Sequence, residues 1–523
     1  MLICWRNYCR RRARPFKQRL PKKGQRGMSS KISCEDSHHM PKQTIERALQ
    51  HADTNLNASL DRLFQLLRIP SISCEPHYAR QCREAASWLA HELSDIGFDA
   101  SVRATIGNPV VVGHSKQATG PHVLFYGHYD VQPVEPLQEW ESQPFEPTLR
   151  VQPNGETHIV ARGASDDKGQ LLTFIEACRA WNATTGSLPV GVSMLFEGEE
   201  ESGSPSMEAF LDEFEHELLA DVMLLCDTSL WNDAVPAITV MFRGLLEEEV
   251  RVTCADRDLH SGAYGNAVRN PIQVLAELIA SLRGRNGEVA IEGFYDNISE
   301  LDSTVRDELL KLNFDTEQFL GAVGLSQSAG DVSYSVMEQL WTRPSCEING
   351  IAGGHCGVGL KTIIPSSAVA KVSFRLVDGQ DPERIRSTFR NHIRARTPRD
   401  CKVQFAGLTG HPASFIQPRS PYLDCARAAL KQEWGCDSVL IGSGGSIPIV
   451  NTVKRRLGLQ SLPIGFARAD NRHHSPNEKY DLYTFQKGIR SWIRILAELS
   501  RCTNDRIVSQ PEQLGGGQYM NRQ

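Results

Sequence analysis

The chain has 523 residues, of which 40% are hydrophobic and 23% are charged, a composition typical of a globular protein with two or three domains. The net charge of −5 conceals an asymmetry, because the first 27 residues carry ten Lys or Arg and no acid. From Met28 onward there are 47 basic and 62 acidic residues, a charge of −15, which argues against nucleic acid as a partner. No apolar run approaches the roughly 20 residues that span a bilayer, so we expect no membrane association.

The fourteen cysteines are scattered and form no C-x-x-C pair, and several lie in apolar runs, such as Cys178, Cys226 and Cys254. This usage is typical of reduced intracellular cysteine and predicts a cytoplasmic protein. We expect residues 1–43 to form a basic, disordered tail, with Met28 as an alternative start. The tail lacks the apolar segment of a secretory signal, and a targeting peptide or a basic arm is the alternative interpretation.

Folded structure is predicted to begin near Thr44. Residues 44–68 have helical spacing, and a second amphipathic helix is predicted over 77–96. Apolar runs over 109–113 and 123–126 predict strands, and a further helix is expected to open at Asp166. The alternation of strands and helices predicts a doubly wound α/β domain, with a mostly parallel sheet flanked by helices.

Three apolar runs predicted to be strands end in possible metal ligands. These are the run 123–126, followed by His128 and Asp130; the run 190–196, followed by Glu197 and Glu199 to Glu201; and the run 221–226, followed by Asp227. Ligands bind at the carboxyl edge of such a sheet, and a histidine beside a carboxylate suits a metal site. A histidine at one strand end is more often structural, so the prediction depends on all three runs.

After about Phe242 the chain changes to alternating strands and amphipathic helices. Strands are predicted over 247–253 and 366–377, and helices over 270–282 and 382–394. This pattern predicts an α+β domain inserted into the first domain. The expected division is 44–242 for the first part of the α/β domain, 243–415 for the insertion, 416–505 for the second part and 506–523 for a flexible tail.

Eight short motifs occur in a fixed order along the chain. They are G-H-Y-D-V-Q-P (127–133), R-G-A-S-D-D-K-G (162–169), E-G-E-E-E-S-G-S (197–204), D-L-H-S-G (258–262), K-T-I-I-P (361–365), F-R-L-V (374–377), G-G-S-I-P (444–448) and H-S-P-N-E (474–478). In these motifs the chain resembles the dinuclear zinc metallopeptidases of the glutamate carboxypeptidase, aminoacylase and succinyl-diaminopimelate desuccinylase family, and most of all the carnosinase-type cytosolic nonspecific dipeptidases. The resemblance covers about residues 45–500. It implies a zinc-peptidase catalytic domain and an inserted ferredoxin-like lid through which two chains form a homodimer.

The resemblance also implies a metal site made of five residues. They are His128, Asp166, Asp227, Glu201 and His474. In this assignment His128 and Asp227 bind the first ion, and Glu201 and His474 bind the second ion. Asp166 binds both ions and bridges them. Imidazole and carboxylate donors suit two divalent ions, with zinc expected first and manganese second.

Two neighbouring acids have other implied roles. Asp130 would orient His128, and Glu200 would be the general base for hydrolysis by a metal-bridged hydroxide. The resemblance further implies that the peptide bond between Asp166 and Asp167 is cis.

The inserted domain is implied to contribute residues that contact substrate. His260, which by itself is more simply interpreted as a turn histidine, would reach the partner's site and stabilise the oxyanion. Arg375 lies in a predicted strand and would pair with the C-terminal carboxylate of the substrate. Thr362 and Ser446 would add hydroxyl donors to that carboxylate.

One position departs from the dipeptidases, in which an acid shortly before the Gly-Gly-Ser of G-G-S-I-P is expected to hold the substrate amine. Ser443 takes that place here, and the lost charge-assisted bond corresponds to about 1.5–3 kcal/mol. We predict a metal-dependent hydrolase of dipeptides, or of related short substrates with a free C-terminal carboxylate. The alternative is an N-acyl-amino-acid amidohydrolase of the aminoacylase, deacetylase or desuccinylase type.

Two other classes fit less well. A non-catalytic binding module is disfavoured because Glu200 and all five implied ligands are present. A serine hydrolase is disfavoured because the glycine- and serine-rich run 442–446 lacks the G-x-S-x-G elbow.

Overall fold

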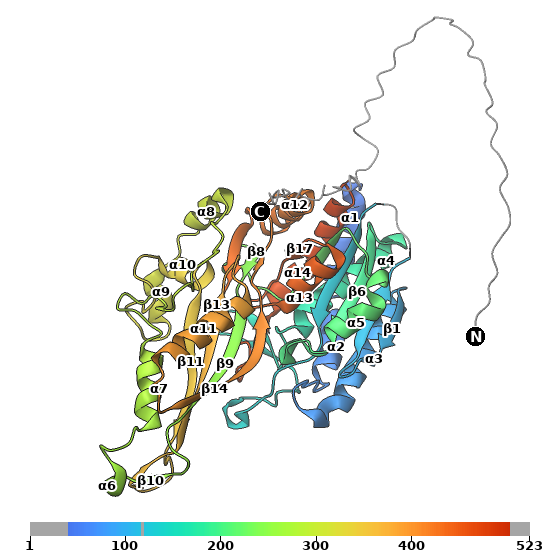
Figure 1. The fold of residues 1–523 in the computed structure, drawn as a ribbon. Helices are drawn as coiled ribbons and strands as arrows, with labels where there is room; N and C mark the ends of the chain where they lie inside the picture. Colours follow the sequence, from blue (N-terminus) through green and yellow to red (C-terminus); the bar gives the residue numbers. More distant parts are fainter. Residues whose placement is uncertain (1–39, 117–119, 503–523) are drawn as a thin grey trace, which may run out of the picture. The chain divides into compact units, whose positions relative to one another are not determined.

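The computed structural model describes residues 40–116 and 120–502 (Figure 1). Most of the predicted basic tail and the whole predicted C-terminal tail lie outside the described residues. Among the residues described, no helix is both long enough and apolar enough to cross a membrane.

The larger sheet has six strands in the order β1-β2-β6-β3-β7-β17. Their bounds are Asp99–Arg103, Val110–His114, Gly191–Glu197, His122–His128, Val222–Leu225 and Ser461–Pro463. Strands β6, β3, β7 and β17 run parallel, whereas β2 is antiparallel to both of its neighbours, β6 and β1. Strands β6 and β7 are buried at every residue, as expected where a parallel sheet is covered on both faces.

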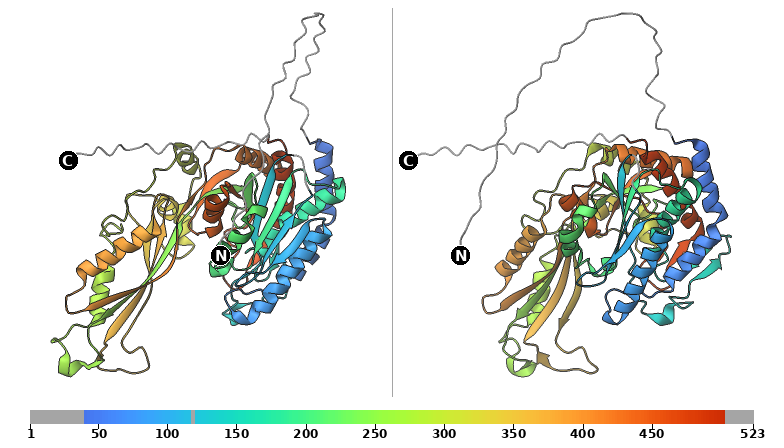
Figure 2. Two further views of the ribbon diagram at one scale, coloured as in Figure 1. Left: turned by 45° about the vertical axis from the view of Figure 1, so that its right-hand side comes forward. Right: turned by 90° about the vertical axis from the view of Figure 1, so that its right-hand side faces the viewer.

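Five helices pack around this sheet and against one another (Figures 1 and 2). They are α1 (Lys42–Thr54), α2 (Leu56–Leu67), α3 (Ala79–Asp95), α4 (Lys168–Thr185) and α14 (Leu482–Leu499). The prediction of continuous helical spacing over 44–68 is wrong in one respect, because the helix is interrupted at Asn55. The Asn55 side chain donates to the carbonyl of His51 at 2.8 Å, so the end of α1 is satisfied locally and α2 starts anew.

Two small sheets bring distant motifs together. Strand β16 (Val439–Ser443) runs parallel to β8 (Ala237–Phe242), which also pairs with β15 (Ser414–Phe415). Strand β18 (Lys479–Asp481) pairs with β5 (Thr157–Val160), next to β4 (Thr148–Val151). The second pairing places the H-S-P-N-E motif beside the R-G-A-S-D-D-K-G motif, although about 300 residues separate them along the chain.

The inserted domain contains an antiparallel sheet of four strands in the order β11-β13-β9-β14. Their bounds are Ser345–Gly353, Ser367–Leu376, Gly244–Thr253 and Lys402–His411. Helices α7 (Pro271–Ala280) and α11 (Pro382–Arg396) pack on one face and share a hydrophobic core with the sheet (Figures 1 and 2). The predicted fold class, an α/β domain with an inserted α+β domain, is confirmed.

Three further helices lie inside the predicted insertion, in a stretch for which the sequence analysis predicted no individual helix or strand. They are α8 (Ser303–Leu310), α9 (Thr316–Gly321) and α10 (Val336–Trp341). Val305, Leu309 and Met337 are buried in the core of the α/β domain rather than in that of the four-stranded sheet. The inserted stretch therefore contributes to both hydrophobic cores.

Candidate active site

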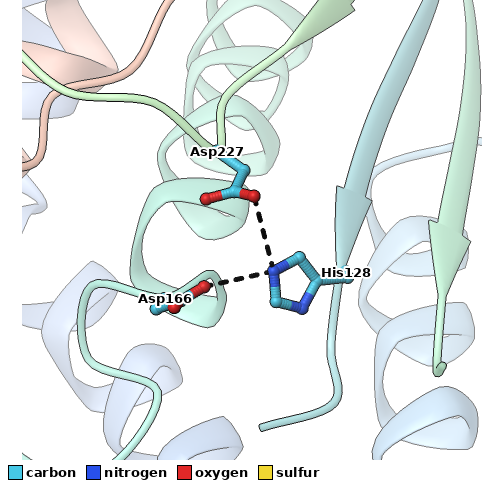
Figure 3. A group of neighbouring side chains, drawn as sticks. All are labelled: His128, Asp166 and Asp227. Carbon is cyan, nitrogen blue, oxygen red and sulfur yellow. Dashed lines mark ion pairs between the residues drawn. The ribbon is translucent and has the colours of Figure 1, made fainter. Parts of the chain in front are cut away.

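The first group of possible metal ligands lies at the carboxyl edge of the six-stranded sheet. His128 is the last residue of β3, Asp227 follows the neighbouring strand β7, and Asp166 lies in the turn before α4. Figure 3 shows the two carboxylates facing the same ring nitrogen of His128. His128 Nε2 lies 3.2 Å from Asp166 Oδ1 and 3.9 Å from Asp227 Oδ2.

A second group shares Asp166 with the first. His474 Nε2 lies 2.9 Å from Asp166 Oδ2 and 3.3 Å from Glu201 Oε2. Glu201 belongs to the short turn that follows β6, and its carboxylate also accepts a hydrogen bond from Gln132. The structure thus brings all five predicted ligands together, with one oxygen of Asp166 directed at each group. The peptide bond between Asp166 and Asp167 is cis, as the sequence analysis expected.

These residues suit divalent metal ions. Each group combines one imidazole with two carboxylates, which is the donor chemistry of zinc and manganese sites. His128 Nε2 is buried and makes no hydrogen bond, so this nitrogen is available as a ligand. The other ring nitrogen, Nδ1, lies 3.4 Å from Asp130 Oδ1 and 3.2 Å from the backbone carbonyl of Asp130. Such contacts are suited to orient a metal-binding histidine.

Burial and neighbouring charges shift the pKa values of several residues of the site. Burial alone would lower the pKa of His128, but its contacts with Asp130 and Asp166 raise that pKa well above the ordinary value. Burial alone would raise the pKa of Asp166, yet its contacts with His128 and His474 hold it well below its usual range. Burial, reinforced by repulsion from Asp166, raises the pKa of Asp227. Metal binding requires unprotonated ligands, so protons held here must leave when an ion binds.

Asp130 has a second contact that the sequence analysis did not predict. Its carboxylate accepts the backbone N–H groups of Glu200 at 3.3 Å and of Glu201 at 3.1 Å. The side chain is fully buried. One carboxylate therefore contacts both the ring of His128 and the turn that carries the predicted base.

Glu200 lines a cavity of about 410 Å³ together with residues from both ligand groups, including Asp227 and His474. Burial raises the pKa of Glu200 well above its ordinary value, and repulsion from Asp227 and Glu201 adds to this while His128 opposes it. A carboxyl group with a raised pKa, placed beside predicted metal ligands in a cavity, is suited to carry a proton during hydrolysis.

Arg375 belongs to strand β13 of the inserted domain and contacts the glycine- and serine-rich loop 442–446 of the α/β domain. Its Nη1 donates to Ser446 Oγ at 3.0 Å, and Ser446 lines the same cavity as Glu200. Among the described residues, Arg375 has no ion-pair partner. Burial lowers the pKa of Arg375, with Glu247 acting in the opposite direction. A half-buried cation without a carboxylate partner is suited to bind an anionic group of a ligand.

Two predicted residues lie apart from this cavity within the single chain. His260 is exposed, and its Nδ1 accepts the backbone N–H of Gly262 at 3.0 Å. Its short strand β10 (Leu259–His260) pairs with β12 (Ile363–Ile364), next to Thr362. Thr362 is exposed and contributes its carbonyl to Ser261 rather than its side chain to the Arg375 site.

Glu478 is a functional candidate that the sequence analysis missed. It is fully buried, and its carboxylate accepts the backbone N–H groups of Gly163, Ser165 and Asp166 at 2.9–3.0 Å. It also pairs with Arg162 at 2.8 Å. Glu478 therefore holds the turn that presents Asp166. Glu478 is the last residue of the H-S-P-N-E motif, so the motif could have indicated it, but the sequence analysis gave a role only to the histidine of this motif.

His473, Trp341 and Ser443 also line the cavity. His473 Nε2 lies 2.9 Å from Ser165 Oγ. Its position next to His474 in the sequence could have indicated that His473 lies at the site. Trp341 comes from α10, in the stretch without a prediction. Ser443 occupies the position where an acid was expected, and its Oγ accepts the N–H of Gly445 at 3.1 Å.

The chain is similar to known metallopeptidases. Residues 124–498 match the model of peptidase family M20/M25/M40. The Cys-Gly metallodipeptidase dug1 of Schizosaccharomyces pombe is 29% identical over 476 residues, which cover 88% of this chain and 99% of that protein. The Beta-Ala-His dipeptidase of Rattus norvegicus is 28% identical over 482 residues, covering 88% and 96%.

Solved structures agree with this assignment. The dipeptidase Dug1p of Saccharomyces cerevisiae has a TM-score of 0.76 at 26% identity, covering 88% of this chain and 100% of that chain. Human carnosine dipeptidase 1 has a TM-score of 0.76 at 25% identity, with the same coverage. The resemblance inferred from the motifs is therefore confirmed: the chain belongs to peptidase family M20/M25/M40 and is a metallopeptidase that uses divalent metal ions.

Proposed function

We propose that the protein is a dipeptidase that cleaves dipeptides, or related short substrates, with a free C-terminal carboxylate. The observation that carries this proposal is the pair of ligand groups that share Asp166, with Glu200 beside them in one cavity. Similar proteins named Cys-Gly metallodipeptidase and Beta-Ala-His dipeptidase support a dipeptide as the substrate.

The proposed cofactors are two divalent ions, with zinc favoured by the donor set and manganese as the alternative. His128 and Asp227 would hold one ion, Glu201 and His474 the other, and Asp166 both. When bound, the ions supply Lewis-acid chemistry, polarising the scissile carbonyl and lowering the pKa of water.

The side chains of the protein supply proton transfer and substrate orientation. Glu200 takes a proton from the attacking water at its carboxylate and delivers it to the leaving amine. Asp130 keeps the turn of Glu200 in place through two backbone hydrogen bonds. Arg375 and Ser446 bind the terminal carboxylate of the substrate. Thr362, which neighbours His260 on the inserted domain, would add its hydroxyl in the site of the partner chain.

We also propose that residues 243–415 act as a lid and join two chains in a homodimer. The outer edge of β11 has no strand partner among the described residues, and its Ile348 and Ile351 are 36% and 61% exposed. Ile272 on the neighbouring α7 is 36% exposed. An open edge with apolar side chains is suited to pair with a second copy. His260, which lies apart from the cavity of its own chain, would then complete that of the partner.

Residues 44–242 and 416–505 form the proposed catalytic domain. A cytoplasmic location is part of the same proposal. It is supported by the cysteines, all of which are free thiols in the residues that the structure describes.

The test is a substrate panel run on chelator-treated protein after addition of zinc or manganese. The panel pairs dipeptides with N-acetyl and N-succinyl amino acids that have the same C-terminal residue. We expect metal-dependent cleavage of the dipeptides and much slower cleavage of the acyl compounds. Cleavage of acyl amino acids alone would replace the proposal with the amidohydrolase alternative, and hydrolysis unaffected by chelation would contradict both.

A further inference from the structure

Two cysteines of the inserted domain lie in direct contact. Cys254 follows the last residue of β9, and Cys401 precedes the first residue of β14. Both are half-buried free thiols, and their sulfur atoms are 3.0 Å apart. Because Thr253 pairs with Lys402 in the ladder, the two cysteines face each other one step beyond its end.

This arrangement is close to that of a disulfide. Residues directly opposite in an antiparallel pair have Cβ atoms about 4.5–5.5 Å apart, and a disulfide needs about 3.5–4.5 Å. The two thiols would have to approach by about 1 Å to reach the usual bond length near 2.05 Å. The end of a ladder allows such an adjustment because no further strand pairing has to shift with it.

We propose that Cys254 and Cys401 are a modification site, at which a disulfide oxidant such as glutathione disulfide closes a reversible intramolecular disulfide. One cysteine thiolate attacks the oxidant, forms a mixed disulfide and releases one glutathione. The other thiolate attacks the protein sulfur of the mixed disulfide, forms the Cys254–Cys401 bond and releases a second glutathione. The protein pair loses two electrons and two protons, and the two glutathione thiols gain them.

The environment of Cys254 affects its reactivity in these steps. Burial raises the pKa of Cys254 to about 12, and the contact with Cys401 adds to this effect. Because the thiolate is the nucleophile, the raised pKa slows attack by Cys254, and the 3.0 Å contact between the sulfur atoms allows either cysteine to close the bond.

The bond would fasten the base of the loop that carries His260. Residues 255–258 lead directly from Cys254 to the short strand β10, and the backbone N–H of Cys254 donates to Ser366 at 3.0 Å. The disulfide would link the base of this loop covalently to the start of β14, which lies 147 residues away in the sequence. The inference is independent of the substrate and of the proposed dipeptidase activity.

The test uses the full-length protein, treated with glutathione disulfide, alkylated and digested with trypsin. We expect mass spectrometry to detect residues 252–257 linked to residues 400–402, and reduction with dithiothreitol to separate them. Because this measurement needs no variant, it does not depend on the folding of a mutant. Oxidised protein that contains only glutathione adducts, free thiols or other cysteine pairings would overturn the proposal.

Three variants refine the test. Cys254→Ser and Cys401→Ser should each lose the linked peptide and leave the remaining cysteine as a free thiol or a glutathione adduct. Cys346→Ser is the matched control, because Cys346 is a half-buried thiol of the same domain with no sulfur contact in the described part of the chain. A linked peptide that disappears in Cys346→Ser would also contradict the assignment.

Discussion

The two main sheets of the protein present functional residues in different ways. In the six-stranded sheet, β6 and β7 are buried along their whole length, and the reactive side chains come after the strands end. In the four-stranded sheet, β13 alternates between buried and half-buried or exposed residues, and Arg375 occupies one of the half-buried positions. A sheet covered on both faces leaves only its edges for polar chemistry, whereas a sheet covered on one face can present such residues within a strand.

We infer from this difference that the two sheets have different roles in the proposed reaction. The edge of the covered sheet carries the proposed metal ligands and base on turns that Asp130 and Glu478 hold by hydrogen bonds to the backbone. The half-open sheet carries Arg375, the proposed cation for the substrate. We therefore expect changes at the covered sheet to affect turnover and metal binding, and changes at the half-open sheet to affect mainly substrate binding.

The largest expected effect is that of Glu200→Gln. Turnover should fall by about 10²–10⁴-fold, the usual range for loss of general acid–base catalysis, while metal content stays at the wild-type level. The measurements are kcat and metal analysis of the purified protein. Glu199→Gln is the matched control, because Glu199 accepts the backbone N–H of Asn108 instead. Loss of metal in Glu200→Gln would mean that the ligand and base roles are wrongly divided between Glu200 and Glu201.

Arg375→Met should affect binding more than chemistry. Loss of a charge-assisted hydrogen bond of about 1.5–3 kcal/mol corresponds to a fall in kcat/KM of about 10–150-fold, carried mainly by KM. Steady-state kinetics with one dipeptide provide the measurement. Arg251→Met, an exposed arginine on β9 of the same sheet, should behave as wild type. An unchanged KM in Arg375→Met would remove the proposed distinction between the two sheets.

Glu478→Gln should weaken metal binding without removing a ligand. Carboxylates that position metal ligands typically contribute about 10–100-fold to affinity, and the amide would repel at least one of the N–H donors now facing it. Competition with a calibrated chelator measures the affinity. Glu433→Gln removes another buried, ion-paired carboxylate of the α/β domain and should leave the affinity unchanged. Equal losses in both variants would indicate a general effect on folding.

Mixing two inactive variants tests whether the lid serves the partner's site. Glu200→Gln and His260→Ala protomers should regain about a quarter of wild-type activity after random exchange, because half the dimers are mixed and each then has one intact site. The readout is turnover after subunit exchange, with exchange itself followed by mass-labelled chains. Exchange without recovery would show that His260 acts in its own chain or has no role.

The smallest effect concerns pH. The pKa of His128 and that of His474 are raised by their carboxylate contacts, so both rings keep their protons to a higher pH than an ordinary histidine. Because metal ions need the neutral ring, binding should release protons, and affinity should increase as pH rises above about 6.5. Calorimetry in two buffers with different ionisation enthalpies measures the released protons. A buffer-independent heat would contradict this coupling.

The sequence by itself determined which residues can do the chemistry. The strand-end pattern at His128 and Asp227 and the motif around Asp166 identified the ligand candidates, because ligand chemistry and apolar runs are local properties of the chain. The alternating pattern over 366–377 likewise predicted a half-covered sheet. Burial leaves a periodic trace in sequence wherever one face of an element is packed.

Only the tertiary structure decided which of these residues meet. It showed that Glu478 binds the turn of Asp166, that Trp341 reaches the cavity from a stretch without a prediction, and that Thr362 lies apart from Arg375. These relations depend on the pairing of β18 with β5 and on packing between segments far apart in the chain. Periodicity records that a side chain is buried but not which distant segment covers it, so such contacts arise only when the chain folds.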